Sequence, residues 1–539
     1  MTTSLTRISY IETGYFSELV EAYVNGDPRL KPFYEYPVTE AGLDQAIADR
    51  RKYPVDRPLL VSELHKQYAG LPASTAVNES IELLLNENTY TICTAHQPAI
   101  FTGTLFFVYK ILHSIRLAQE YNRKRPGEHF IPVYYMGSED ADLDELGHIY
   151  LYGEKLSWAT KQAGAIGRMK PKGLEKIIDR VQGELATLPF GSELIQLITT
   201  CYLESPDIQT ATLRLVHHLF SKYGLLVLIP DNAAFKKKMI PVFEDELFNQ
   251  RSAGIVEQTL DKIGNEFRVQ AQPRPINLFY LEGGIRERIE QSGDRYLVVN
   301  SELSFTTEEL RKELHSHPER FSPNVILRGL FQETILPDVA FVGGGGELAY
   351  WLELKDLFKH YKRFYPQLIL RNSFLVIDRK TKSLLSKLGV GYKDIFLPEQ
   401  QLFSMLVKAG SGHQLTLHDE MEALKKEYEQ ISGISKAVDK TLEAHVAALQ
   451  TQAITRIEQL EKKLLKAEKK KYEALQRQLS TAKSFLFPTG GLQERIENFM
   501  PFYARWGSAF IDIIYEASLL LDQEFVIIEM ETLDAVHTS

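Results

Sequence analysis

Cysteine is almost absent from this sequence: the 539 residues contain two, Cys93 and Cys201. Two distant cysteines exclude a disulfide framework, and no CxxC pair is present that could bind zinc or carry out thiol redox chemistry. We therefore expect a reducing, cytoplasmic compartment and no zinc site. Long apolar runs are also lacking, because charges such as Lys110, Asp512 and Glu516 interrupt them. No run approaches the ~18 apolar residues of a membrane span, and the N-terminus lacks the pattern of a secretory signal.

Neither sign of charge is in large excess. Lys and Arg number 62 and Asp and Glu number 71, which gives a formal net charge of −9. This mild acidity argues against a dedicated nucleic-acid-binding protein. Because 44% of the residues are hydrophobic and 25% are charged, the composition is that of a folded globular protein and not of a disordered chain.

Short β-branched segments alternate with helical patterns as far as about residue 380. Thr89–Ala95 is a candidate buried strand, and apolar residues then recur at helical spacing from Leu105 to Ala118. Phe130–Gly137 and Tyr223–Asp231 are further candidate strands. Later short apolar segments are PINLFYL, DRYLVVN, NVILRG, VAFVGGGG, QLILRN and FLVIDR. Strands that alternate with helices indicate an α/β fold, with a parallel sheet covered on both faces and helical insertions.

The pattern changes after about residue 415. From Val438 the apolar residues recur at spacings of three and four, and no Gly or Pro occurs between Ser435 and Phe487. The pattern predicts one helix of about 50 residues, which at ~75 Å is too long to be buried in one domain and needs a partner helix. We expect a core over 1–414, a coiled-coil helix region over 415–484, and a C-terminal segment over 485–539 that packs back on the core.

The loop HQPAIFTG follows the first clear strand. In open α/β sheets, ligands bind at the carboxyl ends of the strands, beside helix N-termini. His96 and Gln97 would point into that crevice. The backbone N–H groups of Thr102 and Gly103 would be available to a phosphate, and Lys110 would reach the same anion if it faces the crevice. A satisfied structural turn explains the loop equally well, and the motifs GxxxxGK[ST] and GxGxxG are absent.

The acidic loop SEDADLDE follows the next strand. Its five carboxylates could bind Mg²⁺, hold a substrate amine or supply a general base. They are Glu139, Asp140, Asp142, Asp144 and Glu145. Acidic residues at a helix N-terminus are the alternative explanation, because the helix macrodipole favours them there. Arg328, in ILRGLFQETILPD, suits a carboxylate or a phosphate, and its partner is either structural or a ligand.

The segment VAFVGGGGELAYW is the most specific local pattern. Four consecutive glycines favour neither a strand nor a helix, so we expect a tight turn or a close approach of a ligand to the backbone. Glu347 follows directly, and a ligand with carboxylate and ammonium ends, such as an amino acid, would suit both. A close strand–helix crossing is the alternative. The glycines are Gly343, Gly344, Gly345 and Gly346.

Six segments carry a family resemblance: TAHQPAIFTG, VYYMGSEDADLDELGH, YGLLVLIPDN, NVILRGLFQETILPDVAFVGGGGELAYW, LILRNS and LFPTGGLQER. In order, and over nearly the whole chain, they resemble the cysteine ligases of bacillithiol biosynthesis, the BshC family. The resemblance implies a Rossmann-like core related to nucleotidyltransferases and class I aminoacyl-tRNA synthetases, with insertions, a C-terminal coiled coil and a homodimer. It also implies that cysteine is added to glucosaminyl-malate, which yields bacillithiol.

Amide-bond formation from a carboxyl group requires activation, so ATP or another nucleotide with Mg²⁺ is the expected cofactor. Under this interpretation, the residues beside the nucleotide are His96, Gln97, Thr102, Gly103 and Lys110. The candidate catalytic residues are Glu139, Asp140, Asp142 and Arg328. The glycine run and Glu347 would bind substrate, with Arg328 on its carboxylate and Glu347 on its ammonium group.

Two other function classes are also consistent with the sequence. The chain could be an assembly protein in which the long helix binds the partner and the α/β core binds a nucleotide without turnover. The chain could also be a synthetase-like nucleotidyl-transfer enzyme that acts on RNA or another acid. Ligand-linked stabilisation separates the three classes: ATP, cysteine and glucosaminyl-malate stabilise the ligase, RNA alone stabilises the third class, and no ligand stabilises a scaffold.

Overall fold

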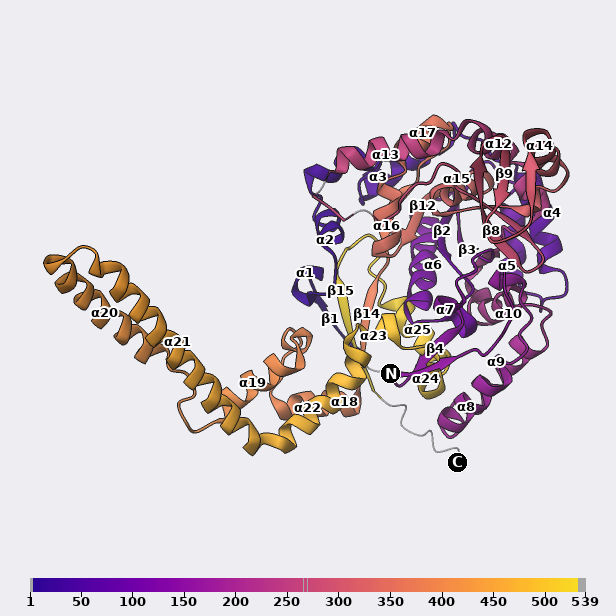
Figure 1. Cartoon of the computed structure of the whole chain (residues 1–539). Helices are drawn as coiled ribbons and strands as arrows, with labels where there is room; N and C mark the ends of the chain where they lie inside the picture. The colour runs from indigo at the N-terminus through magenta and orange to yellow at the C-terminus, as the bar shows by residue number, and fades with distance from the viewer. Residues whose placement is uncertain (1–2, 265, 269, 532–539) are drawn as a thin grey trace, which may run out of the picture. The chain divides into compact units, whose positions relative to one another are not determined.

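The computed structural model describes residues 3–264, 266–268 and 270–531, which form two compact units (Figure 1). The second unit runs from Ile377 to Gly490 and is inserted between the two parts of the first. It starts well before the change of pattern near residue 415. The reason is that two helices from before this change pack on the helices that contain and follow the apolar repeat starting at Val438. The two earlier helices are α18 (Arg379–Leu388) and α19 (Glu399–Gly410), and the helix that follows the repeat is α22 (Glu473–Leu486).

A five-stranded parallel sheet lies at the centre of the first unit, in the order β13-β12-β2-β3-β6. The strands are β2 (Thr89–His96), β3 (His129–Met136), β6 (Leu226–Leu228), β12 (Asp338–Gly343) and β13 (Gln367–Leu370). They are buried along nearly their whole length, which explains their continuous apolar sequences. The predicted α/β fold and its first two strands are confirmed. The order of the strands along the chain reverses between β2 and β12, which is where such sheets bind ligands.

Helices cover both faces of this sheet. On one face, Val342 of β12 belongs to a buried cluster that includes residues of two helices. On the other face, Phe341 packs on Trp351, with ring centroids 4.7 Å apart. Because adjacent strand residues point to opposite faces, β12 anchors both layers. The helices are α3 (Glu40–Arg50) and α6 (Phe106–Lys124) on the first face and α16 (Gly345–Leu352) on the second.

Several apolar segments lie outside the central sheet. PINLFYL and DRYLVVN contribute to an antiparallel sheet, order β10-β9-β8-β7-β11, and FLVIDR to a three-stranded sheet, order β1-β15-β14. NVILRG opens helix α15 (Val325–Ile335). A short apolar run cannot reveal its sheet partners, because pairing depends on distant segments. The strands are β7 (Leu278–Glu282), β8 (Ile285–Ser292), β9 (Arg295–Val298), β10 (Ser304–Thr306), β11 (Phe321–Pro323), β1 (Thr3–Ile8), β14 (Ser373–Asp378) and β15 (Phe525–Met530).

Smaller elements complete the first unit. They are α1 (Tyr10–Thr13), α2 (Glu18–Val24), α4 (Arg57–Tyr68), α5 (Thr75–Leu83), α7 (Leu143–Leu146), the hairpin β4 (His148–Leu151) and β5 (Glu154–Ser157), α8 (Glu175–Leu185), α9 (Gly191–Leu203), α10 (Ile208–Phe220), α11 (Ala233–Lys237), α12 (Ile240–Asn249), α13 (Arg251–Ile263), α14 (Thr307–Ser316), α17 (Lys355–His360), α23 (Gln493–Ile496), α24 (Met500–Trp506) and α25 (Ser508–Glu516). Every helix in the described ranges is too short or too polar to span a bilayer.

The second unit contains two helices that pack side by side, α20 (His418–Val438) and α21 (Leu442–Lys469) (Figure 1). The prediction of one continuous helix across 435–487 is wrong, because the chain turns between α20 and α21 and again at Lys470–Tyr472. Asp439 makes the first turn without Gly or Pro, since its carboxylate accepts hydrogen bonds from the amide and hydroxyl of Thr441. The apolar repeat of α21 therefore packs on a partner helix, α20, from its own chain.

Candidate active site

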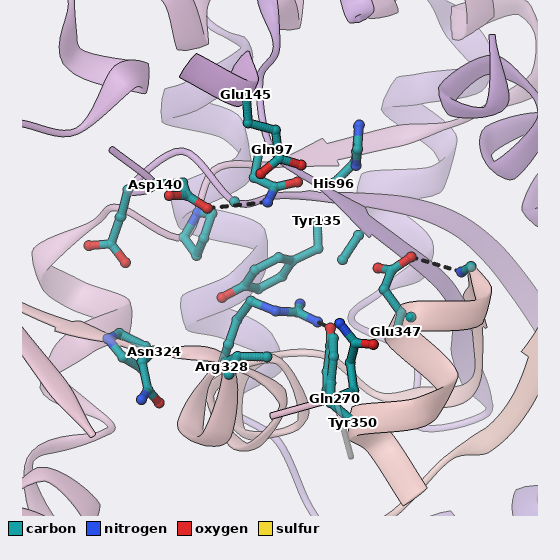
Figure 2. Close-up of a pocket in the computed structure, with 18 of the residues that line it drawn as sticks. His96, Gln97, Tyr135, Asp140, Glu145, Gln270, Asn324, Arg328, Glu347 and Tyr350 are labelled. Atoms are coloured by element: carbon teal, nitrogen blue, oxygen red, sulfur yellow. Dashed lines mark hydrogen bonds between the residues drawn. The ribbon is translucent and has the colours of Figure 1, made fainter. Parts of the chain in front are cut away.

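A cavity of about 860 Å³ lies at the carboxyl ends of the central strands in the first unit (Figure 2). Its volume is in the range of small-molecule sites, and its position is the one expected from the reversal of strand order. All three predicted loops and α15 contribute to its lining. The predicted residues that line it are His96, Gln97, Glu139, Asp140, Arg328, Gly344, Gly345, Gly346 and Glu347, and those that do not are Thr102, Gly103, Lys110, Asp142 and Gly343.

Arg328 extends from α15 into this cavity as a half-buried cation (Figure 2). Its Nη2 donates to the hydroxyl of Tyr350, and its Nη1 lies 3.3 Å from Oε1 of Gln332. The rings of Tyr135, Phe341 and Tyr350 surround the guanidinium at 5.7–5.9 Å. Within the described ranges, Arg328 forms no ion pair with a carboxylate. A half-buried guanidinium that contacts rings, a hydroxyl and an amide but no carboxylate in the described ranges is suited to an anionic ligand.

Lys110 lies beneath the cavity and neutralises Glu347. Lys110 is 1% exposed, and its Nζ is 2.5 Å from Oε2 of Glu347 and 2.5 Å from the carbonyl oxygen of Ala95. The same Oε2 accepts the amide of Gly344 at the start of α16. Burial lowers the pKa of Lys110, and Glu347 partly opposes this shift. Because these contacts use Oε2, the Oε1 atom of Glu347 remains available to an ammonium group.

The four glycines do not form a tight turn. Gly343 ends β12, Gly344 caps α16, and Gly345 and Gly346 form its first turn, all without a positive φ. A Cβ atom on Gly345 would lie 2.7 Å from Cγ2 of Val20, so the close packing of α2 on α16 requires a glycine there. Close packing of two helices, and not a strand–helix crossing, therefore explains the glycine at position 345. The first amides of α16 nevertheless lie at the cavity, where a helix N-terminus favours anions.

Glu139 belongs to a buried network at the cavity wall. Its carboxylate pairs with Lys236, which is fully buried and also donates to the carbonyl oxygen of Glu319. Lys236 also lies 3.5 Å from Asp231, which forms a bidentate pair with Arg168. Burial raises the pKa of Glu139, whereas Lys236 lowers it. Glu139 is thus a neutralised, structurally engaged carboxylate at the edge of the cavity.

The remaining acidic residues of this loop have different surroundings. Asp140 accepts a hydrogen bond from Nε2 of Gln97 at 3.2 Å and lies 3.9 Å from Arg286. Asp142 is exposed and caps α7 by accepting the amide of Glu145 at 3.0 Å. Glu145 itself lines the cavity. No group of three His, Cys, Asp or Glu side chains that could hold a metal occurs in the described part of the chain.

The first loop brings two of its predicted residues to the cavity. His96 ends β2, and its ring packs at 5.2 Å from that of Phe106. Burial lowers the pKa of His96 well below its usual value, and Lys110 and Arg371 lower it further. The imidazole is therefore neutral at physiological pH. Gln97 donates a hydrogen bond to Asp140 and so links this loop to the acidic loop.

Thr102 and Gly103 lie outside the cavity lining. Their amides donate to carbonyl oxygens earlier in the same loop, so the structure does not present them to a phosphate. Phe101 and Thr102 both have positive φ, a conformation that costs energy in residues other than glycine. Asn498 stabilises it by donating from Nδ2 to the carbonyl oxygens of Phe101 and Gly103. The loop is thus a constrained structural turn beyond Gln97.

Sequence patterns do not single out two arginines at the cavity, Arg371 and Arg495. Arg371 follows β13, and its Nη2 lies 2.7 Å from Oε1 of Glu494. Arg495 lies on α23, over the ring of Phe16 at 5.5 Å, and makes no ion pair within the described ranges. The only signal for them is that LILRNS and LFPTGGLQER are among the segments with a family resemblance. Tyr135, Gln270, Asn324 and Tyr350 also line the cavity without having been predicted.

Comparison with known proteins agrees with this architecture. Residues 4–372 match the family model "Bacillithiol biosynthesis BshC, N-terminal Rossmann-like domain", and residues 374–530 match "Bacillithiol biosynthesis BshC, C-terminal coiled-coil domain". Three relatives are each named "Putative cysteine ligase BshC". The relative from Flavobacterium psychrophilum is 38% identical, and the alignment covers 97% of this chain and 99% of the relative. The relative from Flavobacterium johnsoniae is 36% identical with the same coverage of both chains. The relative from Cytophaga hutchinsonii is 35% identical, and the alignment covers 93% of this chain and 94% of the relative. Because both models together span nearly the whole chain, it belongs to the BshC family of bacillithiol biosynthesis, with a Rossmann-like domain and a coiled-coil domain.

Proposed function

We propose that this chain is a ligase that joins the carboxyl group of cysteine to the amine of glucosaminyl-malate. The observation that carries the proposal is Arg328, a half-buried cation without a carboxylate partner in the described ranges, in a ring of aromatic side chains at a cavity of substrate size. Glu347 lies at the same cavity, and its Oε1 atom makes no hydrogen bond within the described part of the chain. Arg328 would bind the carboxylate of cysteine, and Oε1 of Glu347 would bind its ammonium group.

Activation of the carboxyl group is assigned to ATP or another nucleotide with Mg²⁺. When bound, the nucleotide would convert the carboxyl into an acyl adenylate or an acyl phosphate. The amides at the N-terminus of α16, together with Arg371 and Arg495, are the groups at the cavity that suit phosphates. Mg²⁺ commonly binds through phosphates and waters with few protein ligands, so the lack of a three-ligand cluster in the described ranges is compatible with it.

The malate part of the second substrate carries two carboxylates and needs its own cations. Arg274 and Arg286 line the cavity, and Arg286 packs over the ring of Phe279 at 4.1 Å. Its nearest carboxylate, Asp140, is 3.9 Å away, which leaves guanidinium donors for a ligand. We assign the malyl carboxylates to these two arginines.

The proposal also includes a homodimer and a cytoplasmic location. Helices α20 and α21 leave apolar side chains uncovered near their connecting turn: Ile434 is 69% exposed and Val438 is 80% exposed. A second copy of this helical pair would bury them. Cys93 and Cys201 are buried free thiols, as expected in the reducing compartment where a cysteine substrate stays reduced.

A product assay by mass spectrometry tests the proposed reaction. Purified protein is incubated with Mg²⁺–ATP, cysteine and glucosaminyl-malate, and we expect the mass of the amide together with AMP or ADP, which identifies the leaving group. Arg328→Ala should abolish the product while circular dichroism shows an unchanged fold. Absence of product with every nucleotide tested would contradict the proposal. Thermal stabilisation by RNA alone would instead support nucleotidyl transfer to RNA.

A further inference from the structure

Four carboxylates line the cavity, and three of them are engaged by the protein. Glu139 pairs with Lys236, and Glu347 pairs with Lys110. Asp140 holds Gln97, and its Oδ1 accepts the amide of Ala141 at 2.7 Å. The fourth is Glu145, whose carboxylate makes no hydrogen bond and no ion pair in the described part of the chain.

The surroundings of Glu145 suit a proton acceptor. A carboxylate neutralised by a buried lysine is a weak base, because the lysine stabilises its ionised form. Glu145 has the opposite environment: partial burial raises its pKa, and the negative charges of Asp140 and Asp142 raise it further. In Figure 2 its side chain points toward Gln97, which is uncharged. Glu145 is therefore a cavity carboxylate whose raised pKa is not opposed by any neighbouring cation in the described ranges.

The position of Glu145 fits the geometry of the second half-reaction. Its backbone is fixed, because Asp142 caps α7 through the Glu145 amide, whereas its carboxylate bonds to no other residue among those that the structure describes. Figure 2 shows the side chain pointing toward Gln97, on the other side of Tyr135 from Arg328. An amine that approaches a cysteinyl group bound between Arg328 and Glu347 from this side would pass Glu145.

We propose that Glu145 is the general base of amide formation, an assignment that rests on the proposed ligase function. The amine nitrogen forms a bond to the acyl carbon of the activated cysteine. The bond between that carbon and the phosphate oxygen breaks, and the leaving phosphate or nucleotide keeps the electron pair. The proton that the amine loses passes to the carboxylate of Glu145 and then to solvent.

Two nucleophiles separate base catalysis from activation. Wild type, Glu145→Gln and the control Asp144→Asn are assayed with ATP, Mg²⁺, cysteine and either glucosaminyl-malate or hydroxylamine. Asp144 is exposed, neighbours Glu145 on α7 and does not line the cavity. Hydroxylamine is weakly basic and already unprotonated at neutral pH, so it captures activated cysteine as the hydroxamate without help from a base. Mass spectrometry quantifies both products.

We expect E145Q to form the hydroxamate at the wild-type rate and the amide more slowly by a factor on the order of a hundred or more, the usual contribution of a general base. D144N should match wild type with both nucleophiles. An unchanged rate of amide formation in E145Q would overturn the assignment, and so would an equal loss of both products, which would indicate a role in activation. If wild type forms neither product, the proposed ligase function is wrong, and the assignment of Glu145, which rests on it, is wrong as well.

Discussion

Lys110 of α6 and Glu347 of α16 form an ion pair that joins two layers of the fold, with Nζ and Oε2 2.5 Å apart. Their side chains are 1% and 23% exposed, respectively. The pair lies where both helices meet the carboxyl ends of the central strands. The pair has two effects. It fixes the start of α16, because Glu347 also accepts the amide of Gly344, and it neutralises the Glu347 carboxylate at the wall of the cavity.

Lys110→Met should destabilise the protein. The substitution keeps much of the side-chain volume but leaves Glu347 without its cation, and breaking a buried pair from one side costs about 3–5 kcal/mol. We expect a decrease in the free energy of unfolding of about 3 kcal/mol, measured by urea denaturation. The double variant K110M/E347Q should recover part of this loss, because no uncompensated charge remains. Equal stabilities of wild type and K110M would show that the pair contributes nothing.

Arg328→Lys should weaken substrate binding although it keeps the positive charge. Lysine lacks the planar fork that bonds a carboxylate through two parallel donors. Hydrogen bonds to charged groups contribute about 1.5–3 kcal/mol, so we expect the KM for cysteine to rise roughly tenfold or more. Arg311→Lys is the matched control, because Arg311 is an exposed residue of α14 that pairs with Glu244. Steady-state kinetics that give both variants the wild-type KM would refute the role of Arg328.

Asp338 should make stability depend on pH. It opens β12 in a fully buried site, where it accepts hydrogen bonds from Thr91 and Gln332 and lies beside Glu333. Burial raises the pKa of Asp338 to about 6, from 3.8 in the unfolded chain. Between these values the folded state holds the proton more strongly, so the corresponding stability is present at low pH and is lost as the pH rises toward 6.

Asp338→Asn removes this titration. We expect the free energy of unfolding of D338N, relative to wild type, to increase as the pH rises from 4 to 6 and to level off above it. Chemical denaturation at several pH values measures the difference. Asp378→Asn is a useful comparison, because Asp378 caps α18 at the end of β14 and is only half-buried. A constant difference between D338N and wild type would mean that Asp338 is ionised throughout this range.

Val438→Glu should disrupt the proposed dimer. A charge at this 80% exposed apolar position costs little in a monomer but is unfavourable in a buried helix–helix contact. Sedimentation velocity should show a shift from dimer to monomer for V438E. The control Gln452→Glu, at an exposed polar position of α21, should remain dimeric. A dimeric V438E would move the contact elsewhere, and a monomeric wild type would refute the dimer.

The fold and the convergence of the polar loops could be predicted because they depend on short-range patterns. The strand at 89–95, the helix after Leu105 and the strand at 130–137 each carry their own hydrophobic period. The rule that parallel strands place their loops at one edge then brings His96, Asp140 and Glu347 together.

Other features depend on partners that the local sequence does not show. The amides of Thr102 and Gly103 look available in the sequence, yet the loop is closed on itself and held by Asn498, far along the chain. The position of Lys110 in its helical pattern does not predict its partner, because Glu347 is distant in the sequence. The break before Thr441 is made by one aspartate side chain, which a search for Gly and Pro overlooks.

The insertion of the second unit has a consequence for the order in which the catalytic cavity is built. Arg371 is synthesised before the inserted unit, whereas Glu494 and Arg495 leave the ribosome only after it. A nascent chain can therefore assemble the central sheet, but the guanidinium of Arg371 has its carboxylate partner only after Glu494 has been synthesised. Premature termination within the helical insertion yields a protein whose cavity lacks Arg495 and whose Arg371 lacks Glu494, so the lining of the cavity is complete only in a chain that extends beyond the insertion.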